Sequence, residues 1–205
     1  WTEFSAGCLG MAEADIHITQ ARLRAKRGVK WSHYPADVIP AWIADMDFAV
    51  APEIKAALRE VIDAEDFGYP PHNLNDRAAQ AFCGWMTTRH GWTPDPARVV
   101  VATNMMQLMH AMLVMFSEPG DGVVAQTPIY PGFLTVVAQN KRRLDENRLL
   151  RGERRYEMDI TGLRSVIDKR TRIMLLCNPH NPAGRAFEID ELRAIADVAL
   201  EHDLV

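Results

Sequence analysis

The sequence has few cysteines and no long apolar run, and each scarcity excludes a class of protein. Its three cysteines, Cys8, Cys83 and Cys177, are widely spaced and form no Cys-x-x-Cys pair. They predict neither a disulfide framework nor a zinc site, and they fit a reducing cytoplasm. No segment is long and apolar enough to span a bilayer, and residues 1–10 lack the features of a secretory signal, so we expect no membrane association.

Neither sign of charge is in marked excess. The formal net charge of −4 gives no electrostatic reason to expect nucleic acid as a partner. The Gly-x-Ser-x-Gly, P-loop and Gly-x-Gly-x-x-Gly motifs are missing, which argues against hydrolase, NTPase and dinucleotide-binding functions. The seven histidines show no ligand spacing, so we expect no metal. At 48% apolar residues, the 205-residue chain is instead typical of a globular protein with a substantial core.

Two helices are predicted in the first half of the chain from apolar residues spaced i, i+3, i+4 and i+7. One begins at Pro52, a residue favoured at the first helical position, and the other ends at Gly91 with Pro94. Residues 38–48 before them are expected to be mostly extended. The faces predicted to be buried are Ile54, Ala57, Leu58, Val61 and Ile62 in the first helix and Leu74, Ala78, Ala81, Phe82, Trp85 and Met86 in the second.

From residue 98 onward, strands and helices alternate, which predicts an α/β fold with a mainly parallel sheet flanked by helices. Ligands of such sheets lie at the carboxyl ends of strands, where we expect three loops over residues 103–105, 127–132 and 178–185. The predicted strands are 98–103, 122–126, 144–150 and 171–177, the predicted helices are 105–117, 159–169 and 188–202, and Val205 is expected to begin a further strand.

The most informative loop contains two Asn-Pro pairs, Asn178-Pro179 and Asn181-Pro182, after the apolar run at 173–177. The prolines stiffen the backbone and leave two carboxamides able to face one ligand. Asn181 is a candidate donor to an oxygen of that ligand. Asn178 has the alternative role of stabilising the turn, as Asn commonly does.

Each of the other candidate residues has a structural alternative. Asn104 precedes a helix whose free N–H groups are suited to an anion, although most such junctions are simply capped. The ring of Tyr130 is placed to cover a flat ligand or to pack at the sheet edge. Asp45 and Asp47 form either a carboxylate pair or one solvated face of an extended segment.

Six segments of the sequence, taken together, indicate a protein family far more specifically than any one of them alone. They are Lys30-Trp31, Trp42-Ile43-Ala44-Asp45-Met46-Asp47-Phe48, Phe67-Gly68-Tyr69, Arg89-His90-Gly91-Trp92, Pro119-Gly120-Asp121, and Cys177-Asn178-Pro179-His180-Asn181-Pro182 with Gly184-Arg185. In this combination the sequence resembles the pyridoxal-phosphate enzymes of fold type I, the aspartate-aminotransferase superfamily. Within it, the sequence resembles the MalY/PatB group of cystathionine β-lyases, from about residue 15 onward.

The resemblance implies pyridoxal 5′-phosphate as the cofactor and a role for several residues. Asn181 would hydrogen-bond the cofactor's O3′, Tyr130 would stack on the pyridine ring, and the backbone amides of Met105 and Met106 would bind the phosphate. Asn104 stands where family members usually have glycine. Asn tolerates left-handed backbone angles better than most residues, so we expect the phosphate loop to be kept.

The resemblance also implies a homodimer with a shared active site, because Tyr69 would reach the phosphate of the neighbouring subunit's cofactor. Trp42, Asp45 and Asp47 would border the substrate entrance. The family's Schiff-base lysine would lie beyond Val205, so no catalytic residue is assigned in this chain. Residues 1–50 would form an N-terminal arm, with 1–10 hypothesised to be non-native, and residues 51–205 the first part of the large cofactor domain.

For the full-length protein, the resemblance implies a C–S β-lyase that converts a sulfur-containing amino acid such as cystathionine into thiol, pyruvate and ammonia. Transamination on the same scaffold is the alternative within the superfamily. From another class comes the hypothesis of a truncated, non-catalytic fragment or regulatory partner, because this chain lacks the lysine. An unrelated α/β binding protein would require the six segments to match by coincidence.

Overall fold

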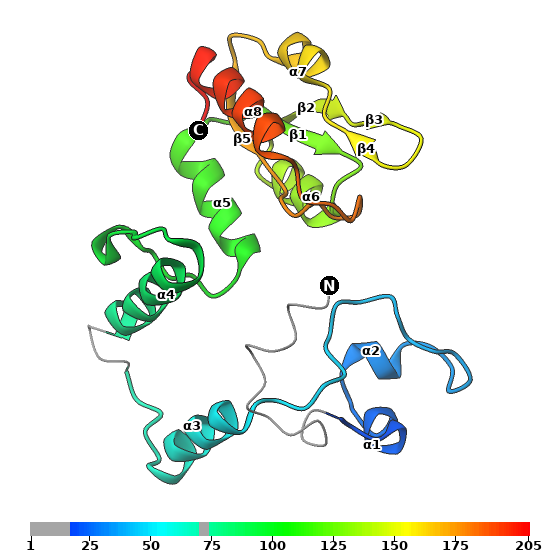
Figure 1. Cartoon of the computed structure of the whole chain (residues 1–205), viewed down its shortest axis with the longest axis vertical. Helices are drawn as coiled ribbons and strands as arrows, with labels where there is room; N and C mark the ends of the chain where they lie inside the picture. Colours follow the sequence, from blue (N-terminus) through cyan, green and yellow to red (C-terminus); the bar gives the residue numbers. More distant parts are fainter. Residues whose placement is uncertain (1–16, 70–73) are drawn as a thin grey trace. The chain divides into compact units, whose positions relative to one another are not determined.

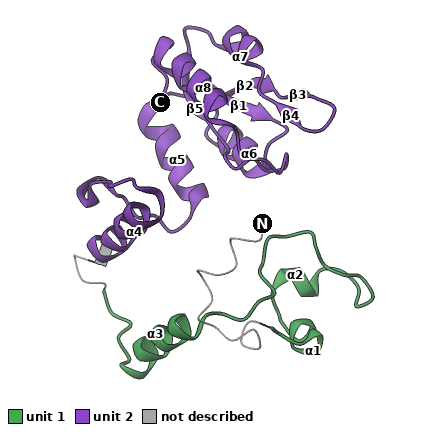
Figure 2. Cartoon of the chain, viewed as in Figure 1, with its two compact units in different colours: residues 1–72 green, residues 73–205 purple. Residues whose placement is uncertain are grey.

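The computed structural model describes residues 17–69 and 74–205, and it divides the chain into two compact units, Trp1–His72 and Asn73–Val205 (Figure 2). The hypothesis about residues 1–10 and the turn residues Pro70 and Pro71 lie outside the described residues. The boundary at residue 50 between arm and cofactor domain stays a prediction.

The first unit consists of three helices joined by irregular chain. They are α1 (Gln20–Arg24), α2 (Val29–Ser32) and α3 (Pro52–Asp63). Thr19 caps α1 by accepting a hydrogen bond from the Arg22 backbone, and Pro52 opens α3 as predicted. The prediction of a buried face on α3 is wrong for this unit: none of its residues is buried. The helical spacing is present, but none of the unit's described residues, 17–69, covers this face of α3.

The second unit begins with α4 (Leu74–His90), which buries a different stripe from the predicted one. Ala79 and Cys83 are buried, whereas Phe82 and Trp85 are 40% and 56% exposed. The two large aromatic side chains therefore lie on the outer face, and the small ones pack inward. The 3-10 helix η2 (Pro96–Arg98) follows α4.

The predicted strand over residues 98–103 is wrong. Asp95 caps η2 by accepting from the Ala97 backbone, and proline at the first position favours a helical turn there. Val100 is 79% exposed, and no described strand pairs with residues 99–103. The β-branched residues of this segment favour extended chain, but they have no neighbouring strand to complete a sheet.

The predicted parallel sheet is confirmed. Its strands are β1 (Gly122–Thr127), β2 (Arg143–Arg148) and β5 (Thr171–Leu175), in the order β2-β1-β5, and both pairings are parallel (Figure 1). A short antiparallel hairpin of β3 (Leu150–Arg151) and β4 (Tyr156–Glu157) follows β2. All six residues of the central strand β1 are buried.

Helices cover both faces of this sheet, which confirms the predicted α/β class. On one face, α5 (Met105–Phe116) and α6 (Pro131–Gln139) pack on β1 and β5; on the other lie α7 (Ile160–Val166) and α8 (Ile189–Glu201). The first cluster contains Met109, Leu113, Val123, Val136, Val137 and Ile173, and the second contains Val124, Leu163 and Val198. Helix α6 was not predicted, because Pro131 and Gly132 suggested only a loop.

The amino-terminal edge of the sheet is fixed by a close approach between β1 and β2. The Asp145 carboxylate accepts from the Thr171 hydroxyl at 2.7 Å and from Arg143 Nε at 2.6 Å. A Cβ atom at Gly122 would lie 1.9 Å from Asp145 Oδ2. Only glycine therefore leaves room for this buried carboxylate.

Val205 lies beside β5, as the prediction of a strand start requires. Its N–H donates to the Arg172 carbonyl at 3.0 Å, and its carbonyl accepts from the Met174 N–H at 2.8 Å, the pattern of a parallel ladder. An apolar cavity of about 150 Å³ lies between α5 and this edge. Across the described residues, no helix is long and apolar enough to cross a membrane.

Candidate functional site

Two of the three predicted ligand loops meet at the carboxyl end of β1. The Tyr130 N–H donates to the Asn181 carbonyl at 2.9 Å, which joins the loop after β1 to the loop after β5. The peptide bonds that precede Pro128, Pro179 and Pro182 are cis. Tyr130 and Asn181, 51 positions apart in the sequence, are thus held side by side by their backbones.

The loop after β5 gives its two asparagines different roles. Asn178 Oδ1 accepts from the Phe187 N–H at 3.0 Å, so Asn178 serves the turn, which was its alternative role. The Asn181 carboxamide is exposed and forms no hydrogen bond with any described residue, while its backbone N–H donates to Cys177 Sγ at 3.4 Å. Asn181 is therefore the asparagine whose carboxamide is available to a ligand.

The start of α5 has backbone donors available for an anion. Asn104 Oδ1 accepts from the Gln107 N–H at 2.9 Å, and Gln107 Oε1 accepts from the Thr103 N–H at 3.3 Å. The N–H groups of Met105 and Met106 have no acceptor among the described residues. The two predicted roles of Asn104 are therefore compatible. Its side chain caps the helix, and the two first-turn amides of Met105 and Met106 are left available for an anion.

The backbone of Asn104 corrects the expectation of left-handed angles. Its φ of −163° and ψ of 166° are extended, a conformation that any residue adopts. The replacement of the family's usual glycine therefore places no strain on this junction. The side chain is tolerated because it folds back onto the first turn of the helix.

Tyr130, in the loop after β1, lies beside the loop after β5 and beside the start of α5. A Cβ atom at Gly132 would lie 2.4 Å from the Tyr130 ring and 2.8 Å from Met106 Sδ, so the ring covers Gly132 beside Met106. The Tyr130 side chain is 48% exposed. The structure therefore brings together Tyr130, Asn181 and the start of α5 at Met105, which lie 25 to 76 residues apart in the sequence.

Asp47, in the first unit, is engaged in a cluster of polar contacts. It accepts from Lys30 Nζ at 2.8 Å and from Trp31 Nε1 at 2.8 Å. These two hydrogen bonds, with Lys30 the larger contribution, hold the pKa of the Asp47 carboxyl below its usual value. Lys30 Nζ also donates to the Asp45 carbonyl at 2.6 Å, so Asp45 contributes its backbone.

Trp42 belongs to the same part of the chain. Its indole Nε1 lies 3.4 Å from the Lys30 carbonyl, and its ring packs against those of His33 and Tyr34. Trp42 and the two aspartates were predicted to border the substrate entrance. Lys30, which is almost completely buried, was named only in a segment of the family resemblance and was given no role. A lysine 15 residues before the Asp-Met-Asp segment gave no local signal of this pairing.

Tyr69 is fully exposed at the end of the described part of the first unit. No described residue contacts its hydroxyl through a hydrogen bond, so its role at a neighbouring subunit stays a prediction.

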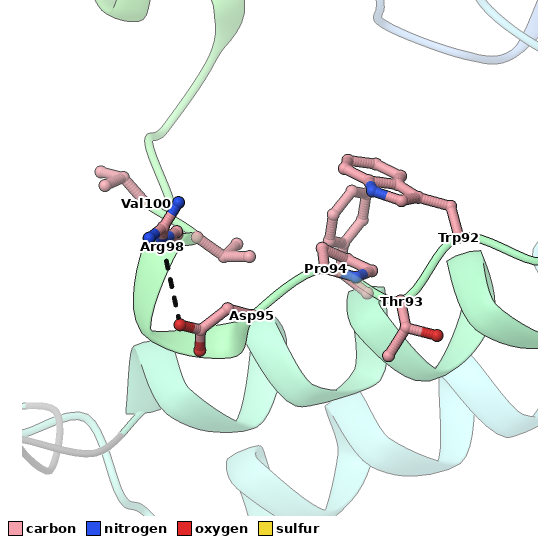
Figure 3. Close-up of a pocket in the computed structure, with 8 residues that line it drawn as sticks. Trp92, Thr93, Pro94, Asp95, Arg98 and Val100 are labelled. Atoms are coloured by element: carbon pink, nitrogen blue, oxygen red, sulfur yellow. Dashed lines mark ion pairs between the residues drawn. The ribbon is translucent and has the colours of Figure 1, made fainter.

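A cavity of about 680 Å³ lies elsewhere in the second unit, between α4 and η2 (Figure 3). The rings of Phe82 and Trp92 meet edge to face there, and Arg98 lies 3.9 Å from the Asp95 carboxylate. None of the predicted site residues lines this cavity. The described residues also contain no cluster of three or more side chains that suits a metal ion.

Comparison with known proteins gives the family. Residues 38–205 match the family model described as "Aminotransferase class I and II". The chain belongs to the class I and II aminotransferases. Among its aminotransferase-family relatives, cystathionine beta-lyase PatB of Bacillus subtilis (strain 168) is 36% identical over 167 residues, which are 81% of this chain and 43% of PatB. Protein MalY of Escherichia coli (strain K12) is 34% identical over 168 residues, 82% of this chain and 43% of MalY.

Solved structures of this aminotransferase family confirm the fold. Cystalysin from Treponema denticola, described as containing a pyridoxal 5′-phosphate cofactor, superposes with a TM-score of 0.83 at 28% identity, over 95% of this chain and 50% of cystalysin. A pyridoxal-phosphate-bound putative aminotransferase from Clostridium difficile 630 gives 0.84 at 27% identity, over 95% and 50%. The chain spans about half the length of the relatives it matches, and the predicted resemblance to the MalY/PatB group is confirmed.

Proposed function

We propose that the full-length protein is a pyridoxal-phosphate-dependent C–S β-lyase acting on a sulfur-containing amino acid of the cystathionine type. The observation that carries this proposal is the convergence of the free Met105 and Met106 amides, the Tyr130 ring and the free Asn181 carboxamide. Two relatives named cystathionine beta-lyase, PatB at 36% identity and the protein of Corynebacterium glutamicum at 30%, support the choice of reaction.

The residues present fit pyridoxal phosphate. The cofactor has a dianionic phosphate, a flat pyridine ring and a phenolic oxygen, and each needs a different partner. The first-turn amides of α5 suit the phosphate, since a helix amino terminus favours an anion. Tyr130 offers a half-exposed aromatic ring, and Asn181 offers an amide donor for the oxygen O3′.

When bound, pyridoxal phosphate supplies an electron sink for the negative charge that develops at the Cα atom of an amino acid. This chain's residues would hold and orient it. Asn104 keeps the two phosphate-facing amides free by capping only Gln107. The backbone hydrogen bond from the Tyr130 N–H to the Asn181 carbonyl holds the two residues side by side, which limits the backbone reorganisation needed on binding.

Other parts of the proposal rest on the family resemblance. Tyr69 would reach the phosphate bound by a second copy, and the protein would act as a homodimer. Trp42, Asp45 and Asp47 would border the substrate entrance, where Lys30 and Trp31 hold the Asp47 carboxylate in place. A cytoplasmic location is proposed from the three separated cysteines.

Transamination is the second candidate, supported by the family model and by the putative aminotransferase that superposes on this chain. Incubation of the full-length protein with cystathionine distinguishes the two. A lyase releases pyruvate and thiol even when no acceptor keto acid has been added to the mixture. Keto acid that appears only when an acceptor keto acid is added contradicts the lyase.

The two asparagines of the loop provide a test of the site. Asn181→Ala in the full-length protein is expected to shift the absorption maximum of bound pyridoxal phosphate and to reduce turnover. Asn178→Ala is the matched control: it is expected to lower the unfolding free energy by about 1 kcal/mol, the net value of one hydrogen bond, because the Phe187 N–H loses its acceptor. Equal spectral shifts in both variants contradict the assignment of Asn181.

The hypothesis of a non-catalytic fragment has its own test. The family's Schiff-base lysine has no counterpart assigned among residues 1–205, so borohydride treatment of this chain with pyridoxal phosphate is expected to label no single lysine. Peptide mapping that finds a specific pyridoxyl-lysine in the 205-residue chain contradicts this expectation.

A further inference from the structure

His180 is buried in the middle of an exposed loop. Its side chain is 2% exposed, whereas its neighbours Pro179 and Asn181 are exposed. The backbone closes around it, because the His180 N–H donates to the Arg185 carbonyl at 2.6 Å and the His180 carbonyl accepts from the Gly184 N–H at 2.8 Å. The imidazole is thus the part of the loop that enters the protein interior.

The imidazole occupies a position that β5 leaves open beside β1. The Thr127 carbonyl points towards β2, since it accepts from the Leu149 N–H. Successive carbonyls of a strand point to opposite sides, so the Gln126 carbonyl points towards β5. The pairing of β5 with β1 ends at Leu175 opposite Ala125, one residue earlier. His180 Nε2 lies 3.3 Å from this unpaired carbonyl.

This geometry assigns the ring nitrogens. A carbonyl only accepts, so Nε2 carries the proton, and Nδ1, which has no partner among the described residues, is the bare nitrogen of a neutral imidazole. Burial, and to a smaller extent the nearby Arg185, lowers the pKa of His180, which favours the same neutral form. The Phe187 ring packs edge to face against the imidazole at 5.6 Å between centroids.

We propose that His180 is a positioning residue that fixes the Asn181 carboxamide over the end of β1 through the bond from Nε2 to the Gln126 carbonyl. Asn181 is the next residue in the chain, and its own carbonyl accepts from Tyr130. One bond therefore fixes the loop to the last part of β1 and the other fixes it to the segment after β1. This role rests on the proposed function, in which Asn181 meets the cofactor.

If the His180 side chain only filled space, another aromatic ring would serve in its place. The variant His180→Phe therefore distinguishes filling space from positioning Asn181. Phe keeps a planar aromatic ring, somewhat larger than the imidazole, and removes the Nε2 donor. His180→Gln places an amide nitrogen at about the same reach as Nε2 and is expected to rescue. His202→Phe, at the far end of α8, is the control for the loss of a histidine that does not contact this loop.

The measurements are made on the full-length protein. His180→Phe is expected to weaken pyridoxal-phosphate binding about two- to tenfold, the range given by one net hydrogen bond, and to shift the absorption maximum of the bound cofactor. His180→Gln and His202→Phe are expected to keep the wild-type spectrum. A His180→Phe variant with wild-type affinity and spectrum overturns the proposal, and so does a His180→Gln variant as impaired as the Phe variant.

Amide hydrogen exchange gives a readout that needs no cofactor. His180→Phe is expected to speed exchange at Tyr130 and Gly184, whose N–H groups are bonded within the fixed loop. If wild-type protein binds no pyridoxal phosphate, the proposed function fails, and faster exchange still supports the anchoring by His180. Unchanged exchange in His180→Phe overturns the anchoring whether or not the cofactor binds.

Discussion

Helix α3 in the first unit and helix α8 in the second are both amphipathic and almost equally long, with 12 and 13 residues, but they differ in burial. In α8, Ile195 is 4% exposed and Val198 is fully buried against the sheet. In α3, Ile54 and Ile62 are 55% and 58% exposed. Helical spacing decides which residues share a face, whereas burial requires a packing partner. Of the residues that the structure describes, those of the second unit provide such a partner for α8, and those of the first unit provide none for α3.

The largest expected effect comes from truncating the same residue type in both helices. Ile195→Ala is expected to lower the unfolding free energy by about 2–5 kcal/mol, because a buried isoleucine leaves a cavity. Ile62→Ala, the matched control in α3, is expected to change it by no more than about 0.5 kcal/mol. Urea denaturation measures both. An equally large loss in Ile62→Ala means that the face of α3 is covered in solution.

A smaller effect is expected from adding one methyl group at two glycines. Gly122→Ala is expected to destabilise the second unit by about 1–3 kcal/mol, since its Cβ would overlap the buried Asp145 carboxylate. Gly84 lies inside α4 with nothing within 4 Å of an added Cβ. Gly84→Ala is therefore expected to stabilise by about 0.5–1 kcal/mol, the gain in helix propensity. Thermal unfolding of the two variants should shift in opposite directions.

The smallest effect concerns the polar contacts that the first unit has in place of a core. The pKa of Asp47 lies below 3.8 in the folded chain, so its bonds to Lys30 and Trp31 persist above that pKa and are lost as the pH falls through it. Trp31 fluorescence is expected to titrate with a midpoint below 3.8. Lys30→Met should raise the midpoint towards 3.8, whereas Lys55→Met, in exposed α3, should leave it unchanged. Identical midpoints in all three proteins would show that Trp31 does not report on Asp47.

The sheet and its central helices were predictable from sequence because their signals are local. Strand β1 was expected at residues 122–126 and runs to Thr127, and α8 was expected at 188–202 and spans Ile189–Glu201. Residues 98–103 carry the same β-branched signal as β1 but form no strand. The difference is a neighbour in space, which the sequence of the segment does not contain.

The site was predictable from sequence where its residues lie in the loops that follow strands or at the start of a helix. Asn181, Tyr130 and the start of α5 were found in this way. His180 was not, because its partner is a backbone carbonyl 54 positions earlier, and a carbonyl has no sequence signature. Lys30 was missed for a similar reason, since its contacts with residues 45 and 47 depend on how irregular chain folds back.

The two asparagines of the loop after β5 share one more property. Each is followed directly by a proline, Pro179 or Pro182. Asparagine deamidates with age when the next residue's backbone nitrogen attacks the side-chain carbonyl, and a proline nitrogen carries no hydrogen to lose in that reaction. The exposed carboxamide of Asn181 is therefore protected from this route of conversion to a carboxylate, which helps the loop to keep its neutral donor as the protein ages.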